Sequence, residues 1–198
     1  MEFNFDPIAV TRMALIYIHV LALAVAAVAV GFGDYAIFAR ERVNMRMLEQ
    51  AARFATLALG LLWVSGLAVI VLDIGLDLDV LASKPKLLAK LSVVTVLTIN
   101  SLALHFLAFP RFATPQADTL QAATLPSIFG AVSAASWLYA AFVGVAKPLA
   151  AVLGFSGFMS VFGALIVVSV ALAVLTIRPR LASRLIPAPM AVGGVAAA

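Results

Sequence analysis

The chain has 198 residues, of which 65% are hydrophobic and only 11% are charged, and its mean hydropathy is +1.15. A soluble domain of this size cannot bury so much apolar surface, so the composition excludes an ordinary globular domain and indicates a polytopic membrane protein. The net charge of +4 does not indicate nucleic-acid binding, because the basic residues flank the apolar runs. The absence of cysteine excludes disulfides and thiolate metal sites.

Five apolar runs predict transmembrane helices in chain order. The runs are continuous and do not alternate between apolar and polar residues, which favours an all-α bundle over a membrane β-barrel. We expect one bundle over residues 1–186, followed by a Pro-, Gly- and Ala-rich tail at 187–198 that is predicted to be disordered. The expected helices span residues 8–38, 52–72, 85–108, 126–146 and 155–177.

The first run begins with Asp6 as a candidate N-cap and Pro7 in the first turn. It lacks a basic leader and is too long for the apolar part of a signal peptide, so we expect it to be retained. His19 stands near its middle on a stripe of small residues, Ala22, Ala26, Ala29 and Gly33, which the helical period places on one face. Small residues let helices approach closely in lipid, so this face is expected to pack against other helices.

The connections are short and carry most of the charge. The segment Arg40–Arg53 is expected to lie at the interface or to extend its neighbours. The segment Asp73–Lys86 reads as a solvated acidic and basic link, and a loop with three prolines follows the third helix. Pro148–Gly154 is expected to form a separate interfacial turn, and Arg178-Pro179-Arg180 to stop the last helix.

An odd number of spans puts the two ends of the chain on opposite sides of the bilayer. One side receives the Arg40–Arg53 link, Arg111 and the Arg178–Arg184 segment, whereas the other receives the acidic Asp73–Asp79 link. Because arginine-rich loops stay in the cytoplasm, we expect the N-terminus outside and the C-terminus inside the cytoplasmic (inner) membrane of a bacterium.

His19 is the first candidate for chemistry, because an ionisable residue at mid-membrane depth is by default a functional hypothesis. A neutral imidazole is a common haem and metal ligand. The alternative is a packing histidine bonded to a backbone carbonyl or to a Ser or Thr hydroxyl. His105 is the other histidine, and its depth is expected to differ from that of His19 by on the order of 10 Å. It serves either as a second ligand or as an interfacial residue.

Three further residues are candidate binding groups. Lys90 shares a face of the third helix with His105, and it is expected either to pair with an anionic group or to snorkel to the interface. Asn100, at a depth similar to that of His19, is expected to hydrogen-bond the imidazole and fix its tautomer. Arg12 lies on about the same face as His19 and either receives a carboxylate near the outer surface or is, like Asp34, a plain boundary residue.

Three segments carry a resemblance to a known family. They are YIHVLALAVAAVAVGFGDYAIFAR, RFATLALGLLWVSGLAVI and KPKLLAKLSVVTVLTIN. The arrangement resembles the CopD-like superfamily of small membrane proteins, which includes the HemJ-type protoporphyrinogen IX oxidases, over residues 12–108. In the HemJ-type proteins a helix-one histidine is thought to bind haem and a helix-three lysine is functional. The resemblance therefore implies these roles for His19 and Lys90.

Together these patterns predict a membrane protein that binds haem b through His19 and acts in electron transfer or porphyrin-linked redox chemistry. His105 is either the second ligand or uninvolved, and Lys90 or Arg12 would receive the propionates. Two other classes stay open. One is a small-solute transporter, with His19 and Asn100 lining a polar path, and the other is an accessory subunit of a larger membrane complex. The bilayer is the expected partner, with a homo-oligomer or a larger assembly possible and no nucleic acid.

Overall fold

A computed structural model describes residues 6–187 of the chain, and within them the secondary structure is helical, with one isolated bridge between Gln116 and Pro187. This confirms the all-α class. The disordered tail predicted from residue 187 onward lies, except for Pro187, outside the described residues. The helices are α1 Pro7–Phe38, α2 Met45–Ile74, α3 Leu78–Ala82, α4 Pro85–Ala103, α5 Phe109–Ala113, α6 Thr119–Ala122, α7 Thr124–Val145, α8 Ala150–Leu172 and α9 Arg178–Ala182, with π-helical turns η1 Leu104–Ala108 and η2 Ala173–Ile177.

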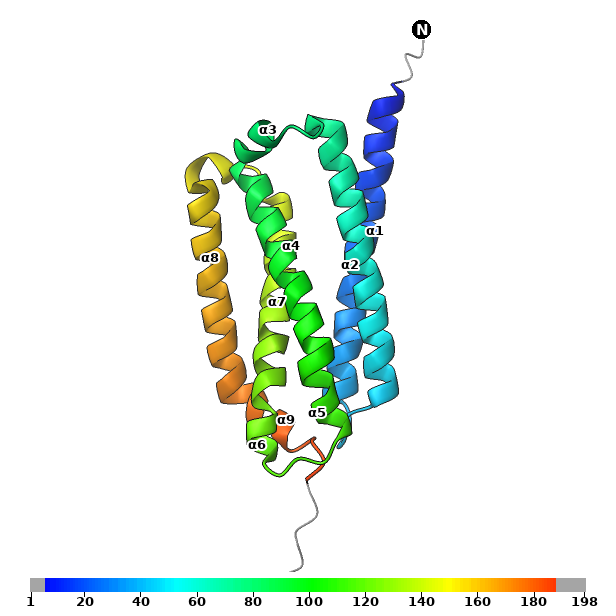
Figure 1. The fold of residues 1–198 in the computed structure, drawn as a ribbon, viewed down its shortest axis with the longest axis vertical. Helices are drawn as coiled ribbons and strands as arrows, with labels where there is room; N and C mark the ends of the chain where they lie inside the picture. The colour runs from blue at the N-terminus through cyan, green and yellow to red at the C-terminus, as the bar shows by residue number, and fades with distance from the viewer. Residues whose placement is uncertain (1–5, 188–198) are drawn as a thin grey trace, which may run out of the picture.

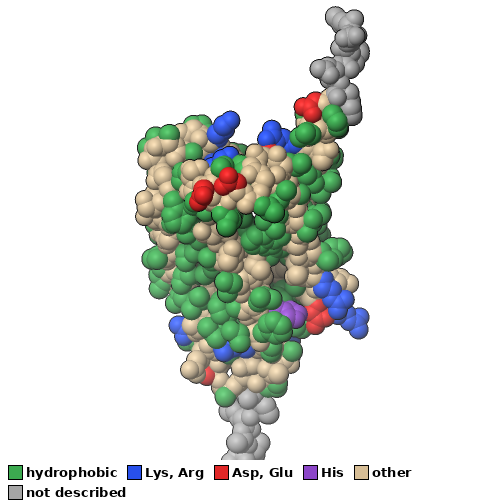
Figure 2. Space-filling model, turned by 45° about the horizontal axis from the view of Figure 1, so that its top comes forward, with side chains coloured by type: hydrophobic (Ala, Val, Ile, Leu, Met, Phe, Trp, Pro, Cys, Tyr) green, Lys and Arg blue, Asp and Glu red, His purple; other side chains and the backbone are tan. Residues whose placement is uncertain are grey.

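Five helical spans within the described residues are long and apolar enough to cross a membrane. They are Pro7–Phe38, Met45–Ile74, Pro85–Ala113, Thr119–Val145 and Ala150–Ala182, with mean hydropathies between 1.7 and 2.7. Large apolar side chains in mid-span stay exposed, including Leu57 at 70%, Val64 at 67% and Val167 at 68%. Figure 2 shows the charged side chains gathered toward the two ends of the molecule, with a largely uncharged surface between them. A surface of this kind is matched to a lipid bilayer.

The five spans form two groups. Helices α1 and α2 pack along each other as an antiparallel hairpin and make few contacts with the rest, whereas α4, α7 and α8 pack mutually (Figure 1). The seam of the hairpin is made of small residues, with Ala22, Ala26 and Ala29 of α1 all at most 5% exposed. The inward orientation predicted for the small-residue stripe of α1 is therefore confirmed.

The three-helix group has its own apolar core. Phe158 and Phe162 of α8 pack with Val93 of α4 and Tyr139 of α7, and all four are at most 3% exposed. The Tyr139 ring stacks on that of Phe162 with a centroid separation of 5.1 Å. Its hydroxyl donates a hydrogen bond to the carbonyl oxygen of Phe158 at 2.5 Å, which satisfies the polar end of a buried ring.

A second apolar cluster joins the two groups at the end of the bundle that carries most of the arginines. It contains Ala36 of α1, Leu48 of α2, Phe112 of α5 and Leu181 of α9. Two arginine side chains reinforce this end through the one-turn helix α6. The guanidinium of Arg111 donates to the carbonyl of Ala122, and that of Arg178 donates to the carbonyl of Leu120. The α1–α2 hairpin is thus tied to the other helices at the arginine-rich end.

Several predicted helix boundaries are wrong, and two of the errors share one cause. The third and fifth spans continue beyond residues 108 and 177, to Ala113 and Ala182, although Pro110 and Pro179 stand in their path. Each proline follows a π-helical turn, η1 or η2. A proline has no N–H to donate and its ring crowds the carbonyl four residues earlier, so a locally wider turn lets the helix continue.

The starts of other helices also differ from the prediction. Helix α2 begins at Met45, capped by the Asn44 side chain, so most of the Arg40–Arg53 link is helical. Helix α7 begins at Thr124, directly after α6, and not at Pro126. The predicted start of α1 is confirmed, because the Asp6 carboxylate accepts the backbone N–H groups of Ile8 and Ala9. The separate turn expected before the fifth span corresponds to a kink at Gly154, whose φ of 59° is left-handed.

Candidate functional site

His19 lies on the seam of the α1–α2 hairpin. Its Nδ1 is 2.9 Å from the hydroxyl oxygen of Ser65, and that hydroxyl donates to the carbonyl of Leu61 at 2.6 Å. Because the Ser65 proton is committed to Leu61, the hydroxyl oxygen accepts from His19, which therefore carries its proton on Nδ1. Gly66 of α2 lies against the ring, since a Cβ at that position would be 3.4 Å from Cε1, which is van der Waals contact. The lone pair of Nε2 is left free of this interaction.

Lys90 stands in the second turn of α4, and its side chain is partly buried. Its ammonium forms no ion pair with another side chain among residues 6–187. Helices α2 and α4 are joined by a hydrogen bond in which the Trp63 indole donates to the Thr98 hydroxyl at 2.9 Å. The two residues on which the family resemblance rests therefore belong to different helical groups, His19 to the α1–α2 hairpin and Lys90 to the three-helix group.

One expected interaction is not formed, and another candidate binding group already has a partner within the chain. Asn100 does not bond His19; it is 6% exposed, and its amide donates to the carbonyl of Phe129 on α7 at 2.9 Å. It therefore fastens α4 to α7 inside the three-helix group. Arg12 forms an ion pair with Asp73 near the end of α2. Asp73 was predicted to belong to a solvated link. Its carboxylate instead pairs with the Arg12 guanidinium, which is therefore not free to bind the carboxylate of a ligand.

His105 does not join His19. It lies in the π-helical turn η1, exposed, with edge-on aromatic contacts to Phe106 and Phe109 at centroid separations of 5.1 and 6.0 Å. It borders a cavity whose first lining residue on α1 is Ala29. His19 precedes Ala29 on the same helix by roughly 15 Å at 1.5 Å per residue. The two histidines consequently belong to two different places in the bundle.

The cavity that His105 borders lies between the α1–α2 hairpin and the other helices, toward the arginine-rich end. Its volume is about 680 Å³, which is within the range of small-molecule sites. It is partly open, and the apolar cluster of Leu48, Phe112 and Leu181 forms its floor. The cavity exists partly because small residues line it. Gly130 of α7 is one of them, and a Cβ added there would meet no atom within 4 Å.

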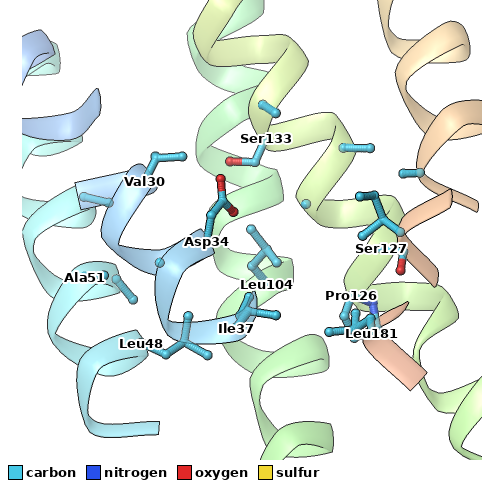
Figure 3. A pocket seen from close by; sticks show the side chains of 18 of the residues that line it. Val30, Asp34, Ile37, Leu48, Ala51, Leu104, Pro126, Ser127, Ser133 and Leu181 are labelled. Carbon is cyan, nitrogen blue, oxygen red and sulfur yellow. The ribbon is translucent and has the colours of Figure 1, made fainter. Parts of the chain in front are cut away.

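A few polar side chains interrupt the apolar lining. Asp34 of α1 points into the cavity toward Ser133 of α7, and Ser127 lies further along the same helix (Figure 3). Ser127 is 3% exposed and its hydroxyl has no hydrogen-bond partner. Among residues 6–187, no Lys or Arg lines the cavity. An apolar cavity with a few convergent polar groups is the usual form of a ligand site.

Both π-helical turns border this cavity. Leu104 and His105 of η1 and Ala173 and Thr176 of η2 are among its lining residues. Single π-turns within α-helices occur often at functional sites, because the wider turn redirects side chains and frees backbone groups. Their joint position at one cavity marks it as a second candidate site, apart from the His19 and Lys90 pair.

Among residues 6–187 no group of three or more His, Cys, Asp or Glu side chains comes together to hold a metal ion. A haem would not require such a group of side chains, because the porphyrin holds the iron and the protein supplies only one or two ligands. His19 fits such a ligand, because its tautomer is fixed by Ser65 and its Nε2 lone pair is free of that bond.

The fold and these two sites define the class of the protein: an all-α bundle with five helices suited to a membrane and two polar sites within it. Comparison with protein-family models, with curated proteins and with solved structures gives no match to this chain.

Sequence reasoning singled out His19 and Lys90 as candidates but missed the cavity. Asp34 was interpreted as a boundary residue because it stands near the end of an apolar run, and Ser127 received no role. One signal was present in the sequence: an X-Pro-Arg tripeptide follows an apolar helix at 109–111 and again at 178–180. Those tripeptides stand directly after the two π-helical turns.

Proposed function

We propose that this protein is a membrane haem-b-binding protein that acts in electron transfer or porphyrin-linked redox chemistry, with His19 as axial ligand. The observation that carries the proposal is the hydrogen bond between Nδ1 of His19 and Ser65. It commits one ring nitrogen to the protein and leaves the other available to iron, which is the arrangement of most ligating histidines. Bound haem would supply a one-electron redox centre.

Lys90 supports the same proposal from the neighbouring helix. Its ammonium group is partly buried and forms no ion pair among the described residues. A partly buried lysine in a membrane helix is stabilised by an anionic partner, and a haem propionate is such a group. His105 is not part of this site, so we propose His19 as the single histidine ligand.

Removal of the His19 imidazole is expected to abolish haem binding. Purified wild-type protein should show a Soret band that sharpens on reduction with dithionite, and His19→Ala should lose it. Ser65→Ala should retain the band but weaken haem affinity by about 10- to 100-fold, because the ring loses its orienting partner. The measurement is an absorption spectrum, oxidised and reduced, combined with a haem titration.

His105→Ala is the matched control, since it removes the other histidine and should leave the spectrum unchanged. A wild-type protein that stays colourless after haem supplementation would refute the proposal. If His105→Ala loses the band and His19→Ala retains it, the haem binds in the cavity that His105 borders and not at His19.

We also propose that the protein resides in the cytoplasmic membrane of a bacterium with its N-terminus outside. Most of the arginines lie at one end of the bundle, whereas Arg12 and the lysines lie with several aspartates at the other. Loops rich in positive charge are retained in the cytoplasm. The arginine-rich end, and with it the cavity, would therefore face the cytoplasm.

The orientation can be tested with two matched serine substitutions, because the chain contains no cysteine. Ser83 and Ser183 are both exposed, stand at opposite ends of the bundle, and each donates to a carbonyl three residues earlier. In intact cells a membrane-impermeant maleimide should label Ser83→Cys and not Ser183→Cys. Permeabilised cells should give both labels, and the reverse pattern in intact cells would contradict the orientation.

A further inference from the structure

We propose that the cavity between the α1–α2 hairpin and α7 binds a lipophilic amine, with the carboxylate of Asp34 as counter-ion to the protonated nitrogen. This site is separate from the His19 site and does not depend on haem. The argument rests on the shape of the cavity, its charge and an unsatisfied hydroxyl group.

The size and lining of the cavity call for a largely apolar ligand. A volume of about 680 Å³ holds a molecule of drug size, and alanine, leucine, phenylalanine and isoleucine side chains make up most of the wall. Small residues on facing helices keep the space free, because Gly130 and Ala134 of α7 and Ala51 and Ala55 of α2 have little to project into it. The ligand body is therefore an apolar chain or ring system.

The charge of the cavity selects a cation. Asp34 is the one acidic residue among its lining residues, and no Lys or Arg shares the cavity with it. Its carboxylate makes no ion pair within residues 6–187. A carboxylate facing an apolar space in a membrane is costly without a partner, so a bound cation would stabilise it and an anion would be repelled.

The hydroxyl groups select a nitrogen that carries hydrogens. The Ser127 hydroxyl is buried, lines the cavity and has no partner, so it is free to bond a ligand. Ser133 faces Asp34 across the cavity (Figure 3). A protonated amine offers several N–H donors and can bond a carboxylate and a hydroxyl oxygen together. A neutral lipid would leave Asp34 without a partner, and a quaternary cation would leave the hydroxyl groups unused.

The proposal can be tested with a pair of probes that differ in charge. The probes are a nitroxide-labelled long-chain primary amine and the matching alcohol, added to protein in lipid nanodiscs. Trp137 lines the cavity and reports contact with the nitroxide through fluorescence quenching. A Trp63→Phe background leaves Trp137 as the remaining tryptophan. We expect saturable quenching by the amine, with binding weakened by on the order of ten- to a hundredfold in Asp34→Asn.

Two matched pairs of variants separate the cavity from the rest of the protein. Glu49→Gln removes a carboxylate from the exposed surface of α2 and should bind the amine like the parent. Gly130→Leu fills the cavity and should abolish saturable quenching by the amine. Gly144→Leu places the same side chain in open space elsewhere on α7 and should leave binding unchanged. His19→Ala should also bind the amine normally, so failure of the haem proposal and failure of this one are distinguishable.

Three results would overturn the proposal. Equal quenching in the Gly130→Leu variant and its parent would mean that the probe reaches Trp137 from the lipid. Quenching that Gly130→Leu abolishes but Asp34→Asn leaves unchanged would identify a site for neutral lipids. Stronger saturable binding of the alcohol than of the amine would exclude Asp34 as a counter-ion.

Discussion

Ala26→Leu is expected to separate α1 from α2 and to lower the free energy of unfolding by about 3 kcal/mol, at the upper end of the usual cost of overpacking. Ala26 is 0% exposed on the seam of the hairpin, where small residues hold the two backbones close. A leucine at such a position has no free volume to enter, so one helix must move away from the other. The displacement would also disturb the bond between His19 and Ser65 on the same seam.

The measurement is reversible unfolding in mixed micelles, followed by near-ultraviolet circular dichroism. Ala27→Leu serves as control, because Ala27 is exposed on the neighbouring face of α1 and has room for the larger side chain. Its free energy of unfolding should stay within about 0.5 kcal/mol of the wild type. A similar loss in both variants would show that the small-residue seam does not set the position of α1.

Phe158→Ala is expected to cost about 3–5 kcal/mol, which is typical when a fully buried phenyl ring is removed and a cavity remains. Phe158 is 0% exposed in the core of α4, α7 and α8. Its carbonyl still accepts the hydroxyl of Tyr139 in the variant, so the loss measures packing and not that hydrogen bond. The three-helix group should loosen, whereas the α1–α2 hairpin has few contacts with it and should stay paired.

The same unfolding measurement applies, with Phe155→Ala as the control. Phe155 stands three residues earlier on α8 and is 42% exposed, so its removal leaves no buried cavity. Its cost should be below about 1 kcal/mol. Equal losses for the two variants would contradict the assignment of Phe158 to a packed core. Loss of the His19–Ser65 pairing in Phe158→Ala would contradict the independence of the two helical groups.

Local rules predicted the start of α1 better than the ends of the third and fifth spans. The start of α1 at Asp6 and Pro7 depends on a cap and a first-turn proline, both of which act over a few residues. The ends of the third and fifth spans depend on distant contacts. Phe112 and Leu181, beyond the two prolines, are buried in the cluster at the arginine-rich end, and this packing favours continued helix past a local break.

The hydrogen-bond and ion-pair partners of the polar side chains could not be predicted from the sequence either. Asn100 and His19 share a similar expected depth, but Asn100 faces α7 and His19 faces α2. Depth along a helix follows from residue number, whereas the direction of a side chain relative to other helices depends on how each helix is rotated in the bundle. The ion pair between Arg12 and Asp73 likewise depends on the pairing of helices, because it forms only where the start of α1 lies beside the end of α2.

The sequence by itself determined the class of the protein, the number of spans and the inward face of α1, because long apolar runs and small-residue stripes are properties of single helices. Only the tertiary structure decided which helices pair, that His19 bonds Ser65 while His105 stands apart, and that a cavity with Asp34 and Ser127 lies between the two groups. Small residues allow either close packing or empty space. At Ala26 a facing helix fills the space, and at Gly130 nothing does, which is a difference that only the arrangement of the helices can make.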